Sequence, residues 1–300
     1  MGTRTLGPGA GIGWLKNALN LGRDNPGAIF GGAALMILVL FAMLLPLILM
    51  MVPMARTNPD PRVLFGAMFA IGLPMMMVFA VMVVGFLRLI DAVETGRQVT
   101  ATHIFAAFRD WPTALRGIGF MLLLFVIQNA LLMALVTVFA PDFGAWYLHN
   151  LQASLSGHQQ PVPAGFGRGF AIMLVVNLLV FAMKAVGLGQ VALRGAGVID
   201  ALKDAVSGAI KNVLPMLVFV LVAIGACLGV ILVLGLLVGL LALLGKAIGI
   251  WILILTIIPL YLGLLLAMIV IMYGIMYYMW RDICGDAAPV PAGSADQLQA

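Results

Sequence analysis

Apolar residues fill six long stretches of the chain, and the short segments between them hold nearly all of the charge. The stretches are approximately Gly27–Met54, Val63–Ile90, Gly117–Ala140, Gly169–Leu188, Val213–Leu244 and Ile248–Met279. A helix of about 20 apolar residues crosses the hydrocarbon core of a bilayer, which is roughly 30 Å thick. Each stretch reaches that length. We therefore predict an all-α polytopic membrane protein with six transmembrane helices.

The composition supports a membrane protein and excludes several other classes. Hydrophobic residues make up 64% of the chain, and 16 basic and 11 acidic residues are too few to cover the exterior of a water-soluble domain. The basic residues are dispersed, with no basic run free of an apolar stretch, so we expect no nucleic-acid partner. Cys227 and Cys284 provide neither a disulfide framework nor a CxxC metal pair.

The basic residues predict the orientation in the membrane, because positively charged loops remain in the cytoplasm. Twelve basic residues fall in one alternating set of segments and four in the other. The larger set is Arg4, Lys16, Arg23, Arg88, Arg97, Arg109, Arg116, Lys184, Arg194, Lys203, Lys211 and Arg281, and the smaller set is Arg56, Arg62, Arg168 and Lys246. We expect both termini in the cytoplasm. The first apolar run is too long for a signal-peptide core and is read as an uncleaved span.

Three short segments that precede the odd-numbered spans share an amphipathic pattern. They are Gly11–Arg23, Thr102–Trp111 and Val198–Asn212, with apolar residues spaced i, i+3, i+4 and i+7. The expected apolar faces are Leu15, Ala18 and Leu19 in the first, Phe105, Phe108 and Trp111 in the second, and Leu202, Ala205, Val206, Ala209 and Ile210 in the third. Because these segments are too short and too charged to span, we expect them to lie in the cytoplasmic membrane interface.

This pattern predicts a weak threefold repeat. The equivalent anchors Leu15, Phe105 and Leu202 are 90 and 97 residues apart. We predict a single six-span domain over residues 11–285, built from three units of an interfacial amphipathic helix followed by a two-helix hairpin. The units cover about 11–98, 99–195 and 196–285. Residues 1–10 are expected to be a flexible leader, and residues 286–300, rich in Ala, Pro and Gly, a disordered tail.

Two other local features bear on the architecture. The loop after the third span keeps a helical period from Phe143 to Leu155, which predicts a short external helix lying on the membrane surface. Pro74 and Pro259 fall inside the second and sixth spans, where proline kinks a helix. A kink in a membrane helix is either a hinge along a substrate path or a tolerated packing feature, and we expect the second.

Polar residues inside the spans are the best candidates for function, since they are costly there. These candidates for lipid or substrate contacts are Gln128 and Asn129 in the third span and Asn177 and Lys184 in the fourth. We expect Asn177 to hydrogen-bond Gln128 or Asn129 as a structural link between the helices. Lys184 shares the helical face of Asn177 and could either extend to the interface or contact a lipid phosphate.

No enzymatic template is present in the sequence. The three histidines, His103, His149 and His158, are too scattered for a metal site, and there is no HExxH, GxSxG or Walker A motif. We therefore assign no catalytic, cofactor-binding or metal-binding residue and expect no cofactor. The absence of an Asp or Glu within the middle of any span also disfavours proton- or sodium-coupled transport.

Two passages resemble a group of uncharacterised bacterial six-span inner-membrane proteins. They are Gly-Ile-Gly-Trp14 with Asn25-Pro26, and Gly85-Phe-Leu-Arg-Leu-Ile-Asp91 followed by Gly96-Arg97 and His103-Ile-Phe-Ala-Ala-Phe-Arg109. The layout over residues 11–285 is also similar to the membrane domain of glycerophosphodiester phosphodiesterases. This resemblance implies interfacial-helix-plus-hairpin units and a location in the bacterial inner (plasma) membrane. It supplies no catalytic residue, because the phosphodiesterase domain has no counterpart in these 300 residues.

The sequence leaves two functions open. The first is a non-enzymatic accessory or scaffold protein, or an envelope-homeostasis factor, that engages membrane lipids or an unidentified membrane protein partner. The second is a transporter or channel for a small or lipidic substrate, with a path at the centre of the three units. A polar cavity lined by Asn129, Asn177 and Lys184 would favour the second function, and a dry, packed centre would favour the first.

Overall fold

The computed structural model describes residues 2–56, 61–155, 161–248 and 251–285, and these parts of the chain are helical without strands. Six long helices within them are long and apolar enough to span a membrane, which confirms the predicted all-α polytopic class. They are α2 (Pro26–Arg56), α3 (Pro61–Glu94), α4 (Trp111–Phe139), α6 (Phe166–Arg194), α8 (Val213–Ile248) and α9 (Trp251–Cys284). The predicted tail at 286–300 lies outside the described residues.

Two of these helices extend beyond the apolar stretches predicted from the sequence. Helix α4 begins at Trp111 rather than Gly117, because the Asp110 carboxylate accepts a hydrogen bond from the Thr113 backbone N–H and a proline occupies the first turn. Helix α6 continues past Leu188 to Arg194. It stops at Gly195, whose φ of 64° is a left-handed conformation that glycine adopts readily.

A short element precedes each pair of long helices. These elements are α1 (Ala10–Leu19), η1 (Ala101–Arg109) and α7 (Val198–Lys211), and a further helix, α5 (Pro141–Leu155), lies between α4 and α6 where a short external helix was predicted. The α-helical period predicted for 102–111 is wrong, since η1 is a 3₁₀ helix and Trp111 already belongs to α4. The Ile104 backbone packs directly on α3 at Gly85, where a Cβ atom would collide with the Ile104 carbonyl.

The hairpins and the short elements form a closed ring. Helices α3, α6 and α9, the second members of the three pairs, contact one another at the centre, and α2, α4 and α8 lie outside them. The short elements η1 and α7 each pack across the hairpin that comes before them in the chain, and α1, the first element, packs across the last hairpin. Thus η1 contacts α2 and α3, α7 contacts α4 and α6, and α1 closes the ring by packing on α8 and α9. The threefold repeat of the sequence stays a prediction, but this cyclic order is a property of the fold.

The leader joins the first part of the chain to the last. The Arg4 backbone N–H donates to the Ile283 carbonyl at 3.0 Å, and the Leu6 N–H donates to Oδ1 of Asn212 at 2.8 Å. Asn212 is completely buried just after α7, and its amide nitrogen donates in turn to the Arg4 carbonyl. The residues expected to form a flexible leader therefore make defined hydrogen bonds to α9 and to the end of α7.

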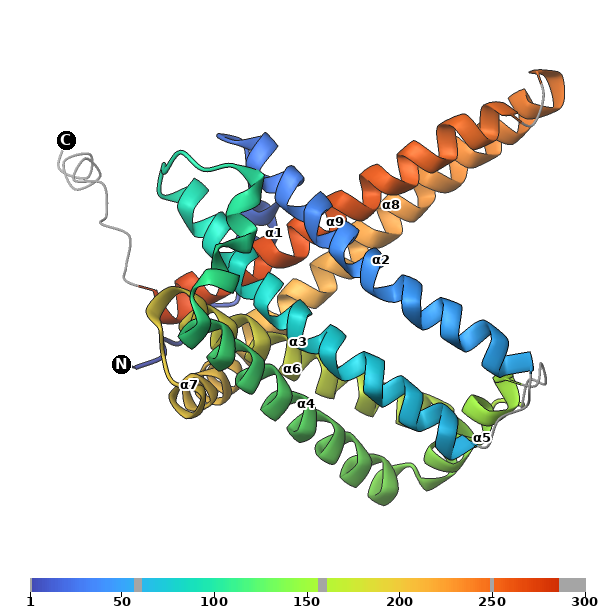
Figure 1. Cartoon of the computed structure of the whole chain (residues 1–300), viewed down its shortest axis with the longest axis horizontal. Helices are drawn as coiled ribbons and strands as arrows, with labels where there is room; N and C mark the ends of the chain where they lie inside the picture. The colour runs from blue at the N-terminus through green and yellow to red at the C-terminus, as the bar shows by residue number, and fades with distance from the viewer. Residues whose placement is uncertain (1, 57–60, 156–160, 249–250, 286–300) are drawn as a thin grey trace.

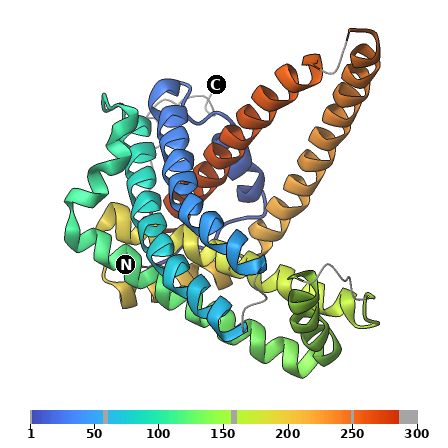
Figure 2. The ribbon, with the colours of Figure 1, turned by 45° about the vertical axis from the view of Figure 1, so that its right-hand side comes forward.

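The hairpins are packed together at one end and separate toward the other. We call the end that carries α1, η1 and α7 the packed end; it includes residues 80–93 of α3, 180–192 of α6 and 270–284 of α9, most of them buried. We call the remainder of the long helices the diverging half. Figure 1 and Figure 2 show the α8–α9 hairpin extending away from the other two hairpins.

Small residues make the packed end possible. A Cβ atom at Gly187 of α6 would collide with the Phe120 ring of α4, and one at Gly189 would collide with the Trp280 ring of α9. Large rings therefore occupy the space that two glycines leave, so that the helix backbones approach closely without any interhelical hydrophobic drive. Pro74 and Pro259 lie instead in the diverging half, where both are exposed and α3 and α9 continue through them. Whether they act as hinges stays a prediction.

Candidate functional site

Two of the polar residues within the spans bind each other. The Gln128 side-chain amide donates to Oδ1 of Asn177 at 3.1 Å, which joins α4 to α6. The Asn177 amide nitrogen donates to the Met173 carbonyl at 2.7 Å, one turn earlier on its own helix. The pair therefore satisfies much of its own hydrogen-bonding capacity inside the apolar layer, as the sequence predicted for a structural link.

The other two predicted residues do not join this pair. Asn129 donates to the Phe125 carbonyl of its own helix at 2.8 Å and makes no bond to Asn177. Lys184 is half-buried two helical turns from Asn177, and among the described residues its side chain has neither an ion-pair nor a hydrogen-bond partner. The four candidates therefore do not form one site, and neither of the two cavities described below is lined by any of them.

Helix α7 presents three distinct faces. Small buried residues face the protein, namely Ala201, Ala205, Gly208 and Ala209. Large apolar residues form an exposed strip beside them, namely Ile199, Val206 and Ile210, and the third face is polar, with Asp200, Lys203 and Lys211. The sequence placed Ala205, Ala209, Val206 and Ile210 on a single apolar face. The structure divides that face into a protein-facing half and a half that no described residue covers.

Helix α1 has the same three faces. Gly11, Trp14 and Ala18 are buried against α8 and α9, whereas Ile12 and Leu19 are exposed and apolar. The polar face carries Lys16 and Asn20. Leu19, which the sequence placed beside Ala18 on one face, thus lies on a different face from it. Trp14 was noted in the sequence only for the resemblance, and its burial was not predicted because a single tryptophan gives no period to detect.

The 3₁₀ element η1 reproduces these faces with a period of three, since residues i, i+3 and i+6 of such a helix share one side. One row, with Ile104 and Ala107, is buried on α3. The next row contains the half-buried Phe105 and the exposed Phe108. The last row is polar and contains His103 and Arg109, with Ala106 between them. All three short elements therefore expose an apolar strip beside a polar one.

Arg88 fastens three helices together at the packed end. Its guanidinium pairs with the Asp110 carboxylate at 2.7 Å and also donates from Nε to the Ala192 carbonyl at 2.9 Å. It thereby connects α3 to the cap of α4 and to the last turns of α6. The hydrogen bond from Arg88 holds the pKa of Asp110 below its ordinary value, because it favours the ionised carboxylate.

A second group of polar contacts connects α3 and α1 to α9. Asp91 accepts hydrogen bonds from Arg97 at 2.8 Å and from the Tyr277 hydroxyl at 3.2 Å. Arg281 lies 3.6 Å from Glu94. The indole N–H of Trp14 donates to Asp282 at 2.9 Å. Sequence reasoning missed this last link, because 268 residues separate its partners and neither carries a local signal.

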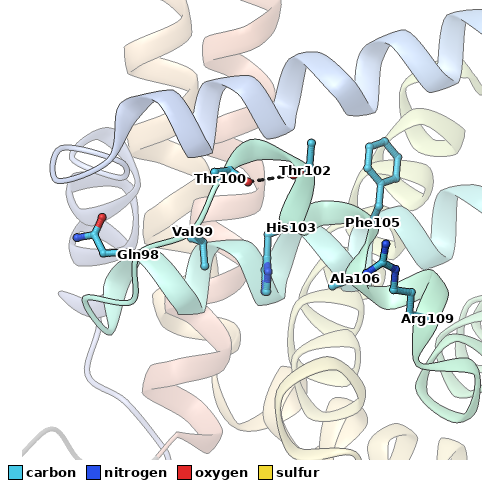
Figure 3. A pocket seen from close by; sticks show the side chains of 8 residues that line it. All are labelled: Gln98, Val99, Thr100, Thr102, His103, Phe105, Ala106 and Arg109. Atoms are coloured by element: carbon cyan, nitrogen blue, oxygen red, sulfur yellow. Dashed lines mark hydrogen bonds between the residues drawn. The ribbon is translucent and has the colours of Figure 1, made fainter.

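A cavity of about 610 Å³ lies against η1 and the loop before it. Its walls are Gln98, Val99, Thr100, Thr102, His103, Phe105, Ala106 and Arg109 (Figure 3). A second, wholly apolar hollow of about 340 Å³ follows α2 in the diverging half and is lined by Leu38, Phe41, Ala42, Leu44, Leu45 and Ile48. The sequence indicated neither cavity. His103 and Arg109 were noted only for the resemblance that they helped to support.

Within the parts of the chain that the structure describes, no three His, Cys, Asp or Glu side chains group in a way that could hold a metal ion. Comparisons with protein-family models, with curated proteins and with solved structures give no match for the chain. The structure has a polar, packed end with three exposed apolar strips, joined to six long helices whose far halves are apolar and separate.

Proposed function

We propose that this integral membrane protein is a non-enzymatic scaffold or envelope-homeostasis factor that binds membrane lipid between its diverging hairpins. One observation carries the proposal, namely the contrast between a packed end fixed by polar contacts and a diverging half whose apolar side chains contact little protein. In the most apolar 18-residue stretches of α4, α8 and α9, only 6% of residues are buried within the protein. Their remaining surface is suited to acyl chains.

The chemistry of the diverging half favours lipid over a protein partner. Its exposed residues are bulky and aliphatic, including Leu221, Leu228, Val233 and Leu236 on α8. Membrane helices that pack on other helices use small residues or polar bridges at the contact. The packed end has such contacts at Gly187 and Gly189, whereas glycines of the diverging half, such as Gly229 and Gly235, have no neighbouring side chain within 4 Å.

A crosslinking experiment tests the proposal. A photoreactive amino acid is placed at Leu228 in the diverging half and, as a control, at Lys203 on the polar face of α7, and the intact protein is irradiated in native membranes. We expect mass spectrometry to find lipid adducts at position 228 and none at position 203. A stoichiometric protein adduct at 228 would replace the lipid proposal with a partner protein. Equal yields of lipid adduct at both positions would reject any distinction between the two regions.

Transport is the second candidate, and Lys184 is the observation that favours it. A cation inside a span with no counter-charge among the described residues is a common mark of a substrate path. The measurement is flux of anionic solutes into liposomes that contain the wild type or Lys184→Gln. The scaffold proposal predicts no flux above empty liposomes in either case. Flux that disappears in the variant would establish transport instead.

We also propose a bacterial inner-membrane location with the packed end in the cytoplasm. The segments that carry the larger set of basic residues converge on that end, while the smaller set belongs to the opposite ends of the hairpins, as Figure 1 shows. In a background with Cys227 and Cys284 replaced by alanine, Val162→Cys should react with an impermeant thiol reagent from outside intact cells, and Lys203→Cys should not. The reverse result would invert the orientation.

A further inference from the structure

The cavity against η1 combines hydrogen-bond donors with room for a ligand. It is lined by the side chains of Arg109, His103, Thr100, Thr102 and Gln98, and no carboxylate is among its walls. A cavity with this lining disfavours a metal cation. Guanidinium, imidazole, hydroxyl and amide groups together are the donors that proteins use for phosphate oxygens.

The 3₁₀ geometry is what places these groups on one side. With three residues per turn, His103, Ala106 and Arg109 fall in a single row, and Thr100 is the extended residue just before the first turn. In an α-helix, Arg109 and His103 would point about 120° apart around the axis. In the 3₁₀ form the two residues are separated by about 12 Å along the axis, with the methyl group of Ala106 between them. The small Ala106 side chain therefore leaves space between the two donors.

Two donors of this row, His103 and Arg109, are not engaged elsewhere within the described residues. Among the described residues, the side chains of His103 and Arg109 have no hydrogen-bond or ion-pair partner, and Arg109 is exposed. The nearest acid in the sequence, Asp110, is already paired with Arg88 at 2.7 Å. Arg116 is likewise used, since it donates to the Gly195 carbonyl at 2.7 Å. Arg109 thus remains available to an external anion.

The neighbouring row agrees with the sequence prediction that this element lies in the membrane interface, which is the level of lipid phosphate groups. Phe105 is half-buried at the cavity wall, and Phe108 is exposed beside it. An exposed aromatic row next to a polar row is the arrangement of an element that lies in the membrane interface. Lipid phosphates occupy that same level.

We propose that the cavity over Ala106 binds a phosphate group, carried by an anionic lipid headgroup or by a free phosphate compound, with Arg109 and His103 as its principal donors. Arg109 supplies the fixed positive charge. The Thr100 and Thr102 hydroxyls hydrogen-bond each other at 2.9 Å, which leaves one of their two O–H groups as a further donor at one edge. The proposal does not depend on lipid binding between the hairpins, because the cavity is at the packed end and the chemistry is polar.

The test measures binding to the full-length protein in a neutral detergent by calorimetry. The probes are short-chain phosphatidic acid, glycerol 3-phosphate, inorganic phosphate and, as a control, short-chain phosphatidylcholine. We expect saturable binding of at least one phosphate monoester. Arg109→Gln should weaken it about tenfold or more, since one charge-assisted hydrogen bond to a doubly charged group is lost. Lys16→Gln, which removes an exposed cation of α1 outside the cavity, should leave affinity within about twofold.

A second variant separates the cavity from simple charge attraction. Ala106→Leu keeps every cation but fills the floor of the cavity, and it should weaken binding as strongly as Arg109→Gln while the melting temperature stays close to that of the wild type. Binding of phosphatidic acid without inorganic phosphate would identify a lipid headgroup, and equal binding of both would identify a free phosphate compound. The proposal is overturned if no probe binds saturably, if Arg109→Gln and Lys16→Gln have equal effects, or if the correctly folded Ala106→Leu binds like the wild type.

Discussion

The two halves of helix α3 have similar apolar composition but different surroundings. Most residues from Ala80 to Val93 are buried among η1, α2, α6 and α9, whereas Phe69 and Leu73 are exposed in the diverging half. Hydropathy does not distinguish them, because lipid and a packed protein interior are equally apolar. What distinguishes them is shape. Glycines and polar links bring the backbones together at the packed end, whereas Gly66 and Gly72, farther along the described part of the helix, have no neighbouring atom within 4 Å.

The largest effect should come from removing a ring at the packed end. Phe86 is fully buried and contacts Tyr273 edge-on, with ring centroids 5.3 Å apart, so Phe86→Ala should lower the free energy of unfolding by about 3–5 kcal/mol. The matched control on the same helix is Phe69→Ala, at a residue that is 64% exposed. It should change stability by less than about 0.5 kcal/mol. Unfolding in mixed detergent measures both, and equal losses would erase the contrast between the two halves.

Adding a methyl group should also change stability differently in the two halves of α3. Gly85→Ala places a Cβ atom against the Ile104 carbonyl, so η1 must move and stability should fall by about 1–3 kcal/mol. Gly72→Ala has no atom within 4 Å to meet and replaces glycine with a better helix former, so it should be neutral or slightly stabilising. If Gly85→Ala were as stable as the wild type, the direct contact of η1 with α3 would be wrong.

The cap of α4 should have a smaller effect that depends on pH. Asp110→Ala removes both the cap and the partner of Arg88 and should destabilise by about 1–2 kcal/mol near neutral pH. Asp110→Asn keeps a capping oxygen and loses only the charge, so its stability should lie between those of the wild type and Asp110→Ala.

The direction of the pH effect follows from the lowered pKa of Asp110, which arises chiefly from the Arg88 hydrogen bond. A lowered carboxyl pKa stabilises the fold above the ordinary value of 3.8, and this contribution disappears as the pH falls through the lowered value. Melting temperatures measured from neutral to acidic pH should therefore converge for the wild type and Asp110→Asn. A constant gap down to the lowest pH would show that the ion pair does not contribute.

The smallest effect is expected for the amide pair between the spans. Asn177→Leu removes the bond from Gln128 and should lower stability by about 0.6 kcal/mol, the average for one interhelical hydrogen bond in a membrane. Its bound-lipid profile should stay unchanged. Gln128→Leu should behave alike, and the double variant should lose little more than either single one, because both remove the same bond. Full additivity would mean that the two amides act separately.

The sequence anticipated some features of the candidate site and missed others for clear reasons. Pairing of Asn177 with an amide of the neighbouring span followed from the cost of polar groups in lipid, although residue type alone did not choose Gln128 over Asn129. The sequence could not predict that His103 and Arg109 line one cavity. They share a face only in a 3₁₀ helix, and the apolar spacing favoured an α-helix. The Trp14–Asp282 bond depends on the ring closing between the two ends of the chain.

The sequence by itself determined the class of the protein, the six spans and the presence of one short element before each pair of spans. These features depend on local quantities, namely the length of apolar runs and the positions of charges. Because unsatisfied backbone groups are costly in lipid, a long apolar run forms a helix. Only the tertiary structure decided which part of each apolar surface meets protein and which stays uncovered. Apolar side chains gain no more from a neighbouring helix than from lipid, so that choice rests on contacts such as Gly85 against Ile104 and Arg88 against Asp110, whose partners are distant or unmarked in the sequence.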